Sequence, residues 1–132
     1  VNEAVTAVST WNRVGWDLFP EAFRLARQAR PGMKLAYNEN VLHDRAEAAD
    51  ARIRQLIDAA APFEIVGDQA HFSPPLIPIP KILARWDAVA AMGKRIEITE
   101  FDCSTWDDRL QAEYVEDLAL AAFSHPAMDS FL

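Results

Sequence analysis

The chain has 132 residues, of which 51% are hydrophobic and 25% charged, a composition typical of a folded globular domain. Its 13 Lys and Arg against 20 Asp and Glu give a formal net charge of −7, which argues against a nucleic-acid partner, because phosphate contacts need clustered basic residues. No apolar run approaches the roughly 20 residues of a membrane span, so no membrane partner is expected. Cys103 is the single cysteine, which excludes an internal disulfide and a cysteine-based zinc site.

Apolar residues recur in two alternating patterns along the chain. Short apolar runs that suit buried strands alternate with longer runs of helical periodicity. Gly93 and two prolines, Pro31 and Pro62, stand where three helical runs end, as residues that stop or cap helices do. The predicted strands are residues 1–5, 34–38, 63–67, 96–100 and 128–132, and the predicted helices are residues 16–29, 46–59, 80–92 and 108–123.

This alternation predicts a parallel sheet with helices between its strands. The predicted strands recur about every 30–34 residues, which suits one strand, one helix and two short loops. Such a pattern is typical of a doubly wound sheet or of a (β/α)₈ barrel. No glycine-rich phosphate loop follows a predicted strand, which disfavours a nucleotide-binding doubly wound domain. Because a barrel needs roughly 250 residues, we expect residues 1–132 to form a single incomplete domain, about half of one.

Polar residues follow the predicted strands at the edge where parallel α/β folds place their chemistry. The segment RIEITEFD, residues 95–102, shows the transition most clearly. Its two isoleucines lie on the same face of the strand as Glu100 and Asp102, because strand side chains alternate between faces. We therefore expect an apolar barrel interior that ends in an acidic rim. The candidate residues at this edge are Asn2, Glu3, Asn38, Glu39, Gln69, His71, Glu100 and Asp102.

Glu3 and Glu100 form the candidate pair of catalytic acids. Two carboxylates from different strands suit glycoside hydrolysis with retention, in which one attacks the anomeric carbon and the other transfers a proton, at about 5–5.5 Å separation. The alternative is that Glu3 is a frayed terminal residue and Glu100 a solvated strand end. Spacing alone leaves both interpretations open.

Several segments carry a resemblance to a known family. VNEA (residues 1–4), QAHF (69–72) and ITEFD (98–102), in this order, resemble the motifs of family 10 glycoside hydrolases, chiefly endo-β-1,4-xylanases. The ending SHPAMDSFL (124–132) is similar to the approach to that family's eighth strand. The resemblance covers essentially the whole chain and implies an α/β fold, namely a partial TIM (β/α)₈ barrel that contains parallel strands four to eight.

The resemblance implies roles for the acids and their neighbours. Glu3 matches the acid/base, Glu100 the nucleophile, and Asn2 the residue that hydrogen-bonds the 2-hydroxyl of the sugar at the cleavage point. His71 matches a histidine held against the nucleophile, with Asp102 as the acid that orients the imidazole.

Three further residues are candidates for the substrate cleft. Gln69 matches a residue beside the acid/base. Asn38 and Trp106 can face the cleft, Trp106 as a flat aromatic wall for a sugar ring. Glu39 is expected to be a loop residue. A metal site on His71 and nearby acids lacks a second histidine, so neither a metal nor an organic cofactor is expected.

The chain also departs from the family pattern. Asp68 stands where relatives usually have an apolar residue, and it should point toward the helix layer, where a buried carboxylate needs a partner. Ala60 and Ile65 stand where relatives commonly have glycine. After YNEN (37–40) the aromatic residue of the family's NDYN pattern is lacking, which puts one contact on the leaving-group side in doubt.

The expected activity of the parent protein is cleavage of internal β-1,4 bonds of xylan with retention. The isolated chain is expected to be inactive, because strands one to three are needed to close the barrel and supply much of the groove. A secreted or periplasmic location follows from the resemblance alone. Two alternatives stay open: a non-catalytic carbohydrate-binding protein on a decayed hydrolase barrel, and a retaining hydrolase of another β-1,4-glycan.

Overall fold

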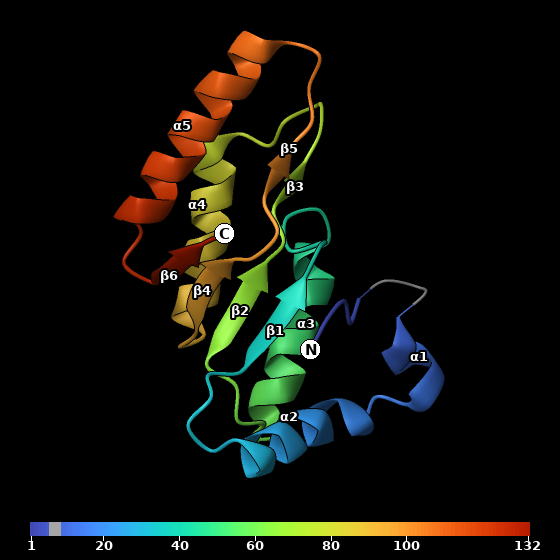
Figure 1. Ribbon diagram of the computed structural model, residues 1–132. Coiled ribbons are helices and arrows are strands. Elements are labelled where there is room, and N and C mark those ends of the chain that lie inside the picture. Colours follow the sequence, from blue (N-terminus) through green and yellow to red (C-terminus); the bar gives the residue numbers. More distant parts are fainter. Residues whose placement is uncertain (6–8) are drawn as a thin grey trace.

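The computed structural model of the chain describes residues 1–5 and 9–132. Its centre is a parallel sheet in the order β1-β2-β4-β6 (Figure 1). A second sheet, of two short strands, continues the chain beyond the C-terminal ends of β2 and β4 (Figure 1). The strands are β1 (Ala36–Glu39), β2 (Ile65–Asp68), β3 (His71–Phe72), β4 (Arg95–Ile98), β5 (Asp102–Cys103) and β6 (Met128–Phe131).

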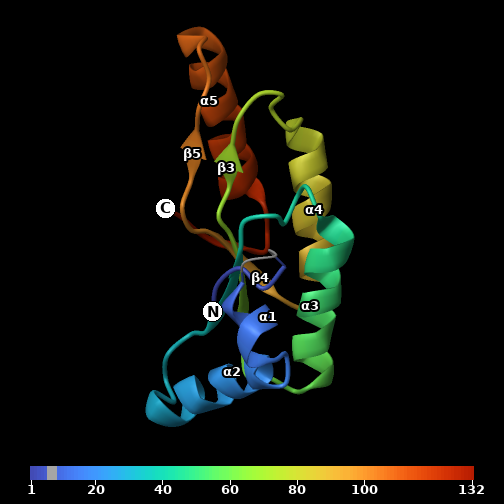
Figure 2. The ribbon, with the colours of Figure 1, turned by 90° about the vertical axis from the view of Figure 1, so that its right-hand side faces the viewer.

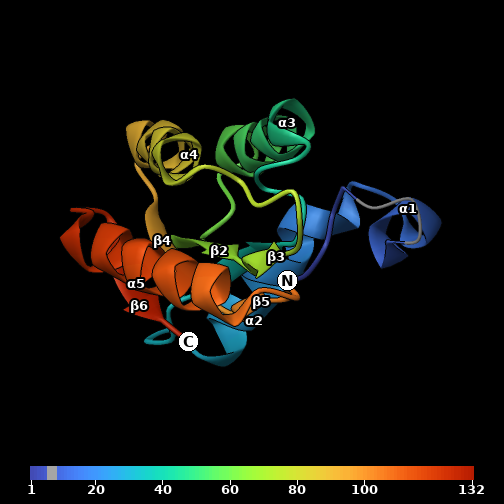
Figure 3. The ribbon, with the colours of Figure 1, turned by 90° about the horizontal axis from the view of Figure 1, so that it is seen from above.

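Helices connect the strands and cover the sheet. Figures 2 and 3 show α3 and α4 on the same side of the strands, and α5 packs against β6 and α4. Among the described residues, no helix is long and apolar enough to span a bilayer. The helices are α1 (Thr10–Val14), α2 (Leu18–Ala29), α3 (Ala46–Asp58), α4 (Ile79–Ala91) and α5 (Asp108–Ser124).

The strand order is that of a barrel wall rather than of a doubly wound sheet. Each long strand pairs in parallel with the next long strand along the chain, and the order never reverses. A doubly wound sheet would reverse its order at a switch point. An isolated parallel bridge pairs Asn2 with Asn38 of β1, so the first residues of the chain lie beside β1. The α/β fold and the parallel sheet expected from the sequence are therefore confirmed.

One face of each long helix supplies the core. Helical residues three, four or seven positions apart lie on one side, so apolar residues at these spacings are buried together. Between them and the sheet lie Ile96 and Ile98, both with no exposed surface. The two isoleucines therefore face the helices, and the expectation that they fill the barrel interior is wrong: Thr99, beside Asn38 and Gly67, lies on the interior face. The buried apolar residues are Phe19, Pro20 and Phe23 on α2, Ala49, Ile53 and Leu56 on α3, Ile82, Trp86 and Val89 on α4, and Tyr114, Leu118 and Ala122 on α5.

Most predicted boundaries lie within two residues of the observed ones, and the exceptions are short elements. Residues 1–5 are not a strand: a single bridge forms at Asn2, and Glu3 then adopts a left-handed backbone with φ of 50°. The sequence did not predict α1, β3 or β5. These elements have five residues or fewer, too few to show a period. The predicted strand 96–100 ends at Ile98 in the structure.

Candidate active site

Asn38 is the hub of a polar network at the C-terminal edge of the sheet. Its Nδ2 atom donates to Asn2 Oδ1 at 2.9 Å and to Glu100 Oε1 at 2.7 Å. Its Oδ1 atom accepts from the Thr99 hydroxyl at 2.6 Å. The Asn38 backbone also binds the first segment, because its carbonyl accepts from Glu3 N at 2.8 Å. Residues almost a hundred positions apart in sequence are thereby linked through one amide.

Gly67 provides the space that the Asn38 side chain occupies. The two residues are register partners on β1 and β2. A Cβ atom at Gly67 would lie 2.4 Å from Asn38 Oδ1 and 3.1 Å from Thr99 Cγ2, and the first distance is impossible without displacement. The sequence did not indicate a role for Gly67 or Thr99. A glycine inside a predicted strand was the available signal, because it often marks a close approach.

His71 lies between two acids at the same edge. Its Nδ1 atom is 2.5 Å from Asp102 Oδ2, and its Nε2 atom is 3.6 Å from Glu100 Oε2. The parallel pairing of β3 with β5 places His71 directly opposite Asp102. Because an ionised carboxylate only accepts hydrogen bonds, Asp102 fixes the Nδ1–H tautomer and turns Nε2 toward Glu100.

Glu3 has a different setting from Glu100. Gln69 Nε2 lies 3.4 Å from Glu3 Oε1, a long contact, and Gln69 itself is only 2% exposed. The left-handed backbone of Glu3 and its hydrogen bond to the Asn38 carbonyl hold the residue at the edge of β1. The structure thus brings Glu3, Glu100, Asn2, Asn38, Gln69, His71 and Asp102 to one end of the sheet, as the sequence predicted for their location.

Glu39 is not the loop residue that the sequence suggested. It ends β1 with no exposed surface. Its carboxylate accepts hydrogen bonds from the Tyr37 hydroxyl at 2.5 Å, Val5 N at 3.1 Å and Asn40 N at 3.1 Å. Burial and the neighbouring carboxylate raise the pKa of Tyr37, which keeps its hydroxyl protonated as a donor. Glu39 therefore fastens the backbone just after Glu3 to β1.

Asp68 does point away from the candidate acids, as its position next to Gln69 required. It is 1% exposed, and it has partners that the sequence did not identify, His43 and the indole of Trp86. In the part of the chain that the structure describes, no cluster of His, Cys, Asp and Glu side chains is arranged to hold a metal ion.

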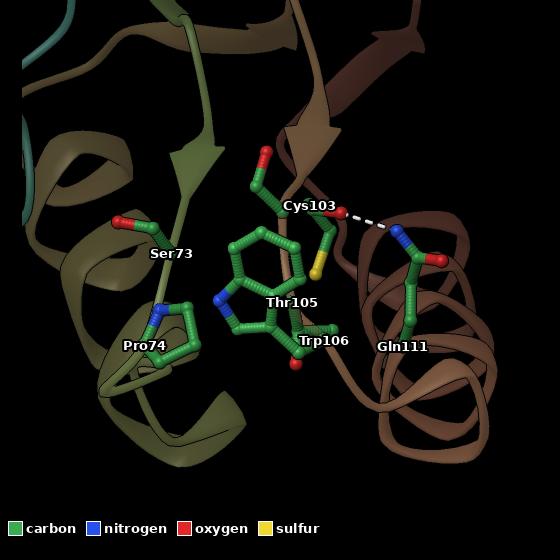
Figure 4. Close-up of a pocket in the computed structure, with 7 residues that line it drawn as sticks. Ser73, Pro74, Cys103, Thr105, Trp106 and Gln111 are labelled. Atoms are coloured by element: carbon green, nitrogen blue, oxygen red, sulfur yellow. Dashed lines mark hydrogen bonds between the residues drawn. The ribbon is translucent and has the colours of Figure 1, made fainter.

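Trp106 lines a pocket beyond β3 and β5. The indole is fully exposed, and in Figure 4 it lies between Pro74 on one side and Gln111 on the other. The pocket has a volume of about 460 Å³. Gln111 lines the pocket and donates to the Cys103 carbonyl at 2.5 Å. Burial, with a smaller contribution from Asp102, raises the pKa of the Cys103 thiol and keeps it in its neutral form.

Comparison with known proteins identifies a single family. The model of glycosyl hydrolase family 10 matches residues 1–130. Among curated proteins, a β-1,4-xylanase of Dictyoglomus thermophilum is 31% identical over 82% of this chain and 31% of its own length. Endo-1,4-β-xylanase 1 of Arabidopsis thaliana is 26% identical over 99% of this chain and 14% of its own. An anti-sigma-I factor of Acetivibrio thermocellus is 27% identical over 99% of this chain and 17% of its own.

Solved structures give the same grouping. The intracellular xylanase of Thermoanaerobacterium saccharolyticum superposes with a TM-score of 0.86 and 26% identity, covering 99% of this chain and 45% of that one. The endo-1,4-β-xylanase of Caldicellulosiruptor owensensis gives 0.83 and 26%, covering 99% and 48%. The chain therefore spans just under half of these solved chains and a third or less of the curated relatives described above.

Proposed function

The chain belongs to glycosyl hydrolase family 10, and on that basis we propose that the protein of which it is part is a retaining endo-β-1,4-xylanase. The observation that carries the proposal is the network at the sheet edge, in which Asn38 donates to Glu100 and His71 lies beside it, while Glu3 lies at the same edge beside Gln69. Two carboxyl groups in unlike surroundings are what a retaining glycosidase needs.

In the proposed first step, Glu100 and Glu3 act on opposite sides of the scissile bond. The Glu100 carboxylate forms a bond to the anomeric carbon, while the Glu3 carboxyl donates its proton to the glycosidic oxygen of the leaving sugar. In the second step Glu3 takes a proton from water, the hydroxyl group bonds to the anomeric carbon, and the bond to Glu100 breaks. Two inversions at one carbon return the original β configuration.

Asn38 and the two residues of the His71–Asp102 pair would serve Glu100. Asn38 Nδ2 holds one carboxylate oxygen at 2.7 Å, and His71 faces the other. The hydrogen bond from Asn38 gives the nucleophile a fixed orientation when the sugar arrives. Asp102 would orient His71 through Nδ1. Asn2, held by the same Asn38 amide, is proposed to bind the 2-hydroxyl of the reacting sugar.

Gln69 and Trp106 would act on the other parts of the substrate. Gln69 is proposed to hold Glu3 in place through its amide. Trp106 offers a flat apolar surface suited to the face of a pyranose ring, with serine and threonine hydroxyls nearby to hydrogen-bond its edge. The steps derived from these residues use protein side chains and water alone.

Xylan or a xylo-oligosaccharide is the proposed substrate, and the rest of the parent chain is the proposed partner of this half. We expect the isolated 132 residues to be inactive on xylan, because the groove needs strands one to three of the barrel. Detectable hydrolysis by the purified chain would contradict this. A secreted or periplasmic location remains a prediction from family resemblance.

The test follows product anomers by NMR as the full-length protein hydrolyses xylo-oligosaccharides. Initial release of the β-anomer is expected, and Glu100→Gln should lower kcat at least about a thousandfold while retaining the side-chain volume. Initial release of the α-anomer would contradict the double-displacement mechanism. Absence of turnover in the wild-type protein would contradict the proposed activity.

The match to an anti-sigma-I factor, a relative that is not named as a hydrolase, leaves a second candidate open: a carbohydrate-binding protein without catalysis on a decayed hydrolase barrel. It predicts xylo-oligosaccharide binding that Glu100→Gln leaves unchanged, with no turnover. A third is a retaining hydrolase of another β-1,4-glycan. Relative kcat/KM on xylan and β-1,4-glucan oligomers of matched length separates it from the xylanase.

A further inference from the structure

The link between β2 and β3 contains an unusual backbone. Gln69 and His71 flank Ala70, which has a φ of 58° in the left-handed region. This region is unfavourable for any residue with a Cβ atom, so a local interaction must hold Ala70 there. Ala70 is 3% exposed and its carbonyl accepts from Asp102 N at 3.4 Å, which places the turn inside the fold.

The left-handed turn determines where its two neighbours point. Gln69 is buried and its amide reaches toward Glu3, whereas His71 is exposed and reaches Asp102 and Glu100. An extended Ala70 would change the directions of both side chains relative to each other. The turn is therefore a common determinant of the surroundings of both candidate acids.

Asp68 is the side chain that closes this turn. Its Oδ1 atom accepts from Ala70 N at 3.1 Å, two residues further on, the pattern of an Asx turn. The backbone carbonyl of Asp68 is fixed at the same time by Thr99 N at 2.9 Å, so the residue is tied to both β4 and its own turn.

The second carboxylate oxygen is held from two other elements. Oδ2 accepts from Trp86 Nε1 at 2.9 Å, and His43 Nε2 lies 2.7 Å from it. Trp86 comes from α4, and His43 from the loop between β1 and α3. All three side chains are 7% exposed or less. A buried carboxylate with three donors is fully satisfied, and it is too firmly fixed to follow Ala70 into another conformation.

Building on the proposed function, we propose that Asp68 is a positioning residue of the active site. It pins Ala70 in the left-handed conformation and so aims Gln69 at Glu3 and His71 at Glu100. Asp68 touches neither candidate acid, and its effect reaches them through the backbone of residues 69–71. His43 and Trp86 serve as the anchors of this carboxylate on the helix side of the sheet.

The test is a set of variants of the full-length protein. Asp68→Asn keeps the size, but one amide oxygen cannot accept from both Ala70 N–H and the His43–Trp86 side. We expect kcat on xylo-oligosaccharides to fall about tenfold or more with little change in KM, the sign of misplaced catalytic groups. Adding Ala70→Gly should restore most of the lost kcat, because glycine adopts the left-handed region without cost.

Controls separate positioning from simple stability. Asp87 lies on α4 and pairs with His125 at 3.3 Å, but its side chain is exposed and takes no part in the turn, so Asp87→Asn removes a histidine-paired carboxylate from the same helix and should leave kcat unchanged. Unchanged kcat in Asp68→Asn, or a loss that Ala70→Gly does not reduce, would overturn the proposal. If Asp68→Asn does not fold, Trp86→Phe removes one hydrogen-bond donor to Asp68 and keeps an aromatic ring in the core, and a loss of kcat in the same direction is expected. Unchanged kcat there would overturn it as well.

A second readout does not depend on activity. In the full-length protein, the ¹H–¹⁵N NMR signals of the His71 ring report its contacts with Asp102 and Glu100. We expect these signals to shift in Asp68→Asn and to return when Ala70→Gly is added. Signals identical to the wild type would overturn the positioning role. If the wild-type protein lacks turnover, the proposed function fails, and the ring signals still decide the role of Asp68.

Discussion

The two ends of the parallel sheet use polar side chains in different ways. At the C-terminal end, hydrogen bonds and a 3.6 Å contact connect successive strand ends into one chain of side chains: Asn2, Asn38, Glu100, His71 and Asp102. At the N-terminal end, charged side chains form separate groups, Arg27 with Glu64 and Asp129 with Arg95 and Lys34. In barrel folds the first end carries the chemistry and the second carries stability. A convergent network at one end only is therefore evidence of function that no single residue supplies.

The N-terminal pairs show what a purely structural arrangement looks like. Arg27 forms a close ion pair with Glu64 and also donates to the Met33 carbonyl at 2.9 Å. Asp129 accepts from Arg95 Nε at 2.7 Å and Lys34 Nζ at 3.1 Å. These contacts fasten loops to strands and leave no acid directed toward another acid.

Gly67→Ala is the strongest way to break the C-terminal network without touching a proposed catalytic group. The new Cβ would displace Asn38 Oδ1, which lies 2.4 Å from it, and so loosen Glu100 and Asn2 together. A displacement of about 1 Å at a catalytic group can cost about a hundredfold, and we expect kcat/KM of the full-length protein to fall by that order. Steady-state kinetics on xylo-oligosaccharides measures it.

Gly32→Ala is the matched control for this prediction. A Cβ atom at Gly32 meets nothing within 4 Å, and its backbone is not in the left-handed region. Its kcat/KM should equal that of the wild type. If Gly67→Ala also leaves kcat/KM unchanged, Asn38 does not determine the position of Glu100.

The sequence predicted the regular part of the fold because the signal there is local. The helical periodicity of α3 and α4 and the apolar runs of β2 and β4 can each be recognised within one continuous segment. The observed bounds of these elements lie within two residues of the predicted ones. The first segment shows the limit. Residues 1–5 have the composition of a strand, but the left-handed turn at Glu3 leaves a single bridge to β1.

The sequence predicts where the candidate site lies, but not which side chains contact one another there. Parallel strands must bring Glu3, Glu100 and His71 to the same edge, so their neighbourhood follows from order alone. The partners of Asp68 and Glu39 could not be read in the same way. Some of these partners are distant in sequence and fall in no periodic pattern, such as His43, 25 positions from Asp68, and Val5, 34 positions from Glu39.

Substitutions just after the C-terminal ends of α3 and α4 probe the N-terminal end of the sheet, where we expect effects on stability alone. Both helices are followed by a left-handed residue, Ala60 with φ of 50° and Gly93 with φ of 76°. After α3, Ala61 N donates to the Leu56 carbonyl at 2.9 Å, which completes a capping motif that favours glycine at position 60.

We therefore expect opposite results from exchanging the two residue types. Ala60→Gly should raise the free energy of unfolding by about 0.5–1 kcal/mol, and Gly93→Ala should lower it by about 1 kcal/mol. Urea denaturation of the full-length protein measures both changes. Neither variant should alter kcat, and a loss of stability in Ala60→Gly would contradict the capping role of that position.

Asp129→Asn has the smallest expected effect on stability, and it tests most directly whether the two ends of the sheet act independently. Hydrogen bonds from Arg95 and Lys34 hold the pKa of Asp129 below its usual value. A carboxyl group whose folded-state pKa is depressed contributes stability above its unfolded value of about 4 and loses that contribution as the pH falls through the folded-state pKa. The wild type should therefore exceed Asp129→Asn by less than about 1 kcal/mol near neutral pH, as exposed ion pairs do. The difference should shrink toward zero in acid and in about 1 M salt, and urea denaturation across pH measures it. A change in kcat at neutral pH would instead show that the N-terminal pairs reach the active edge and that the two ends are not independent.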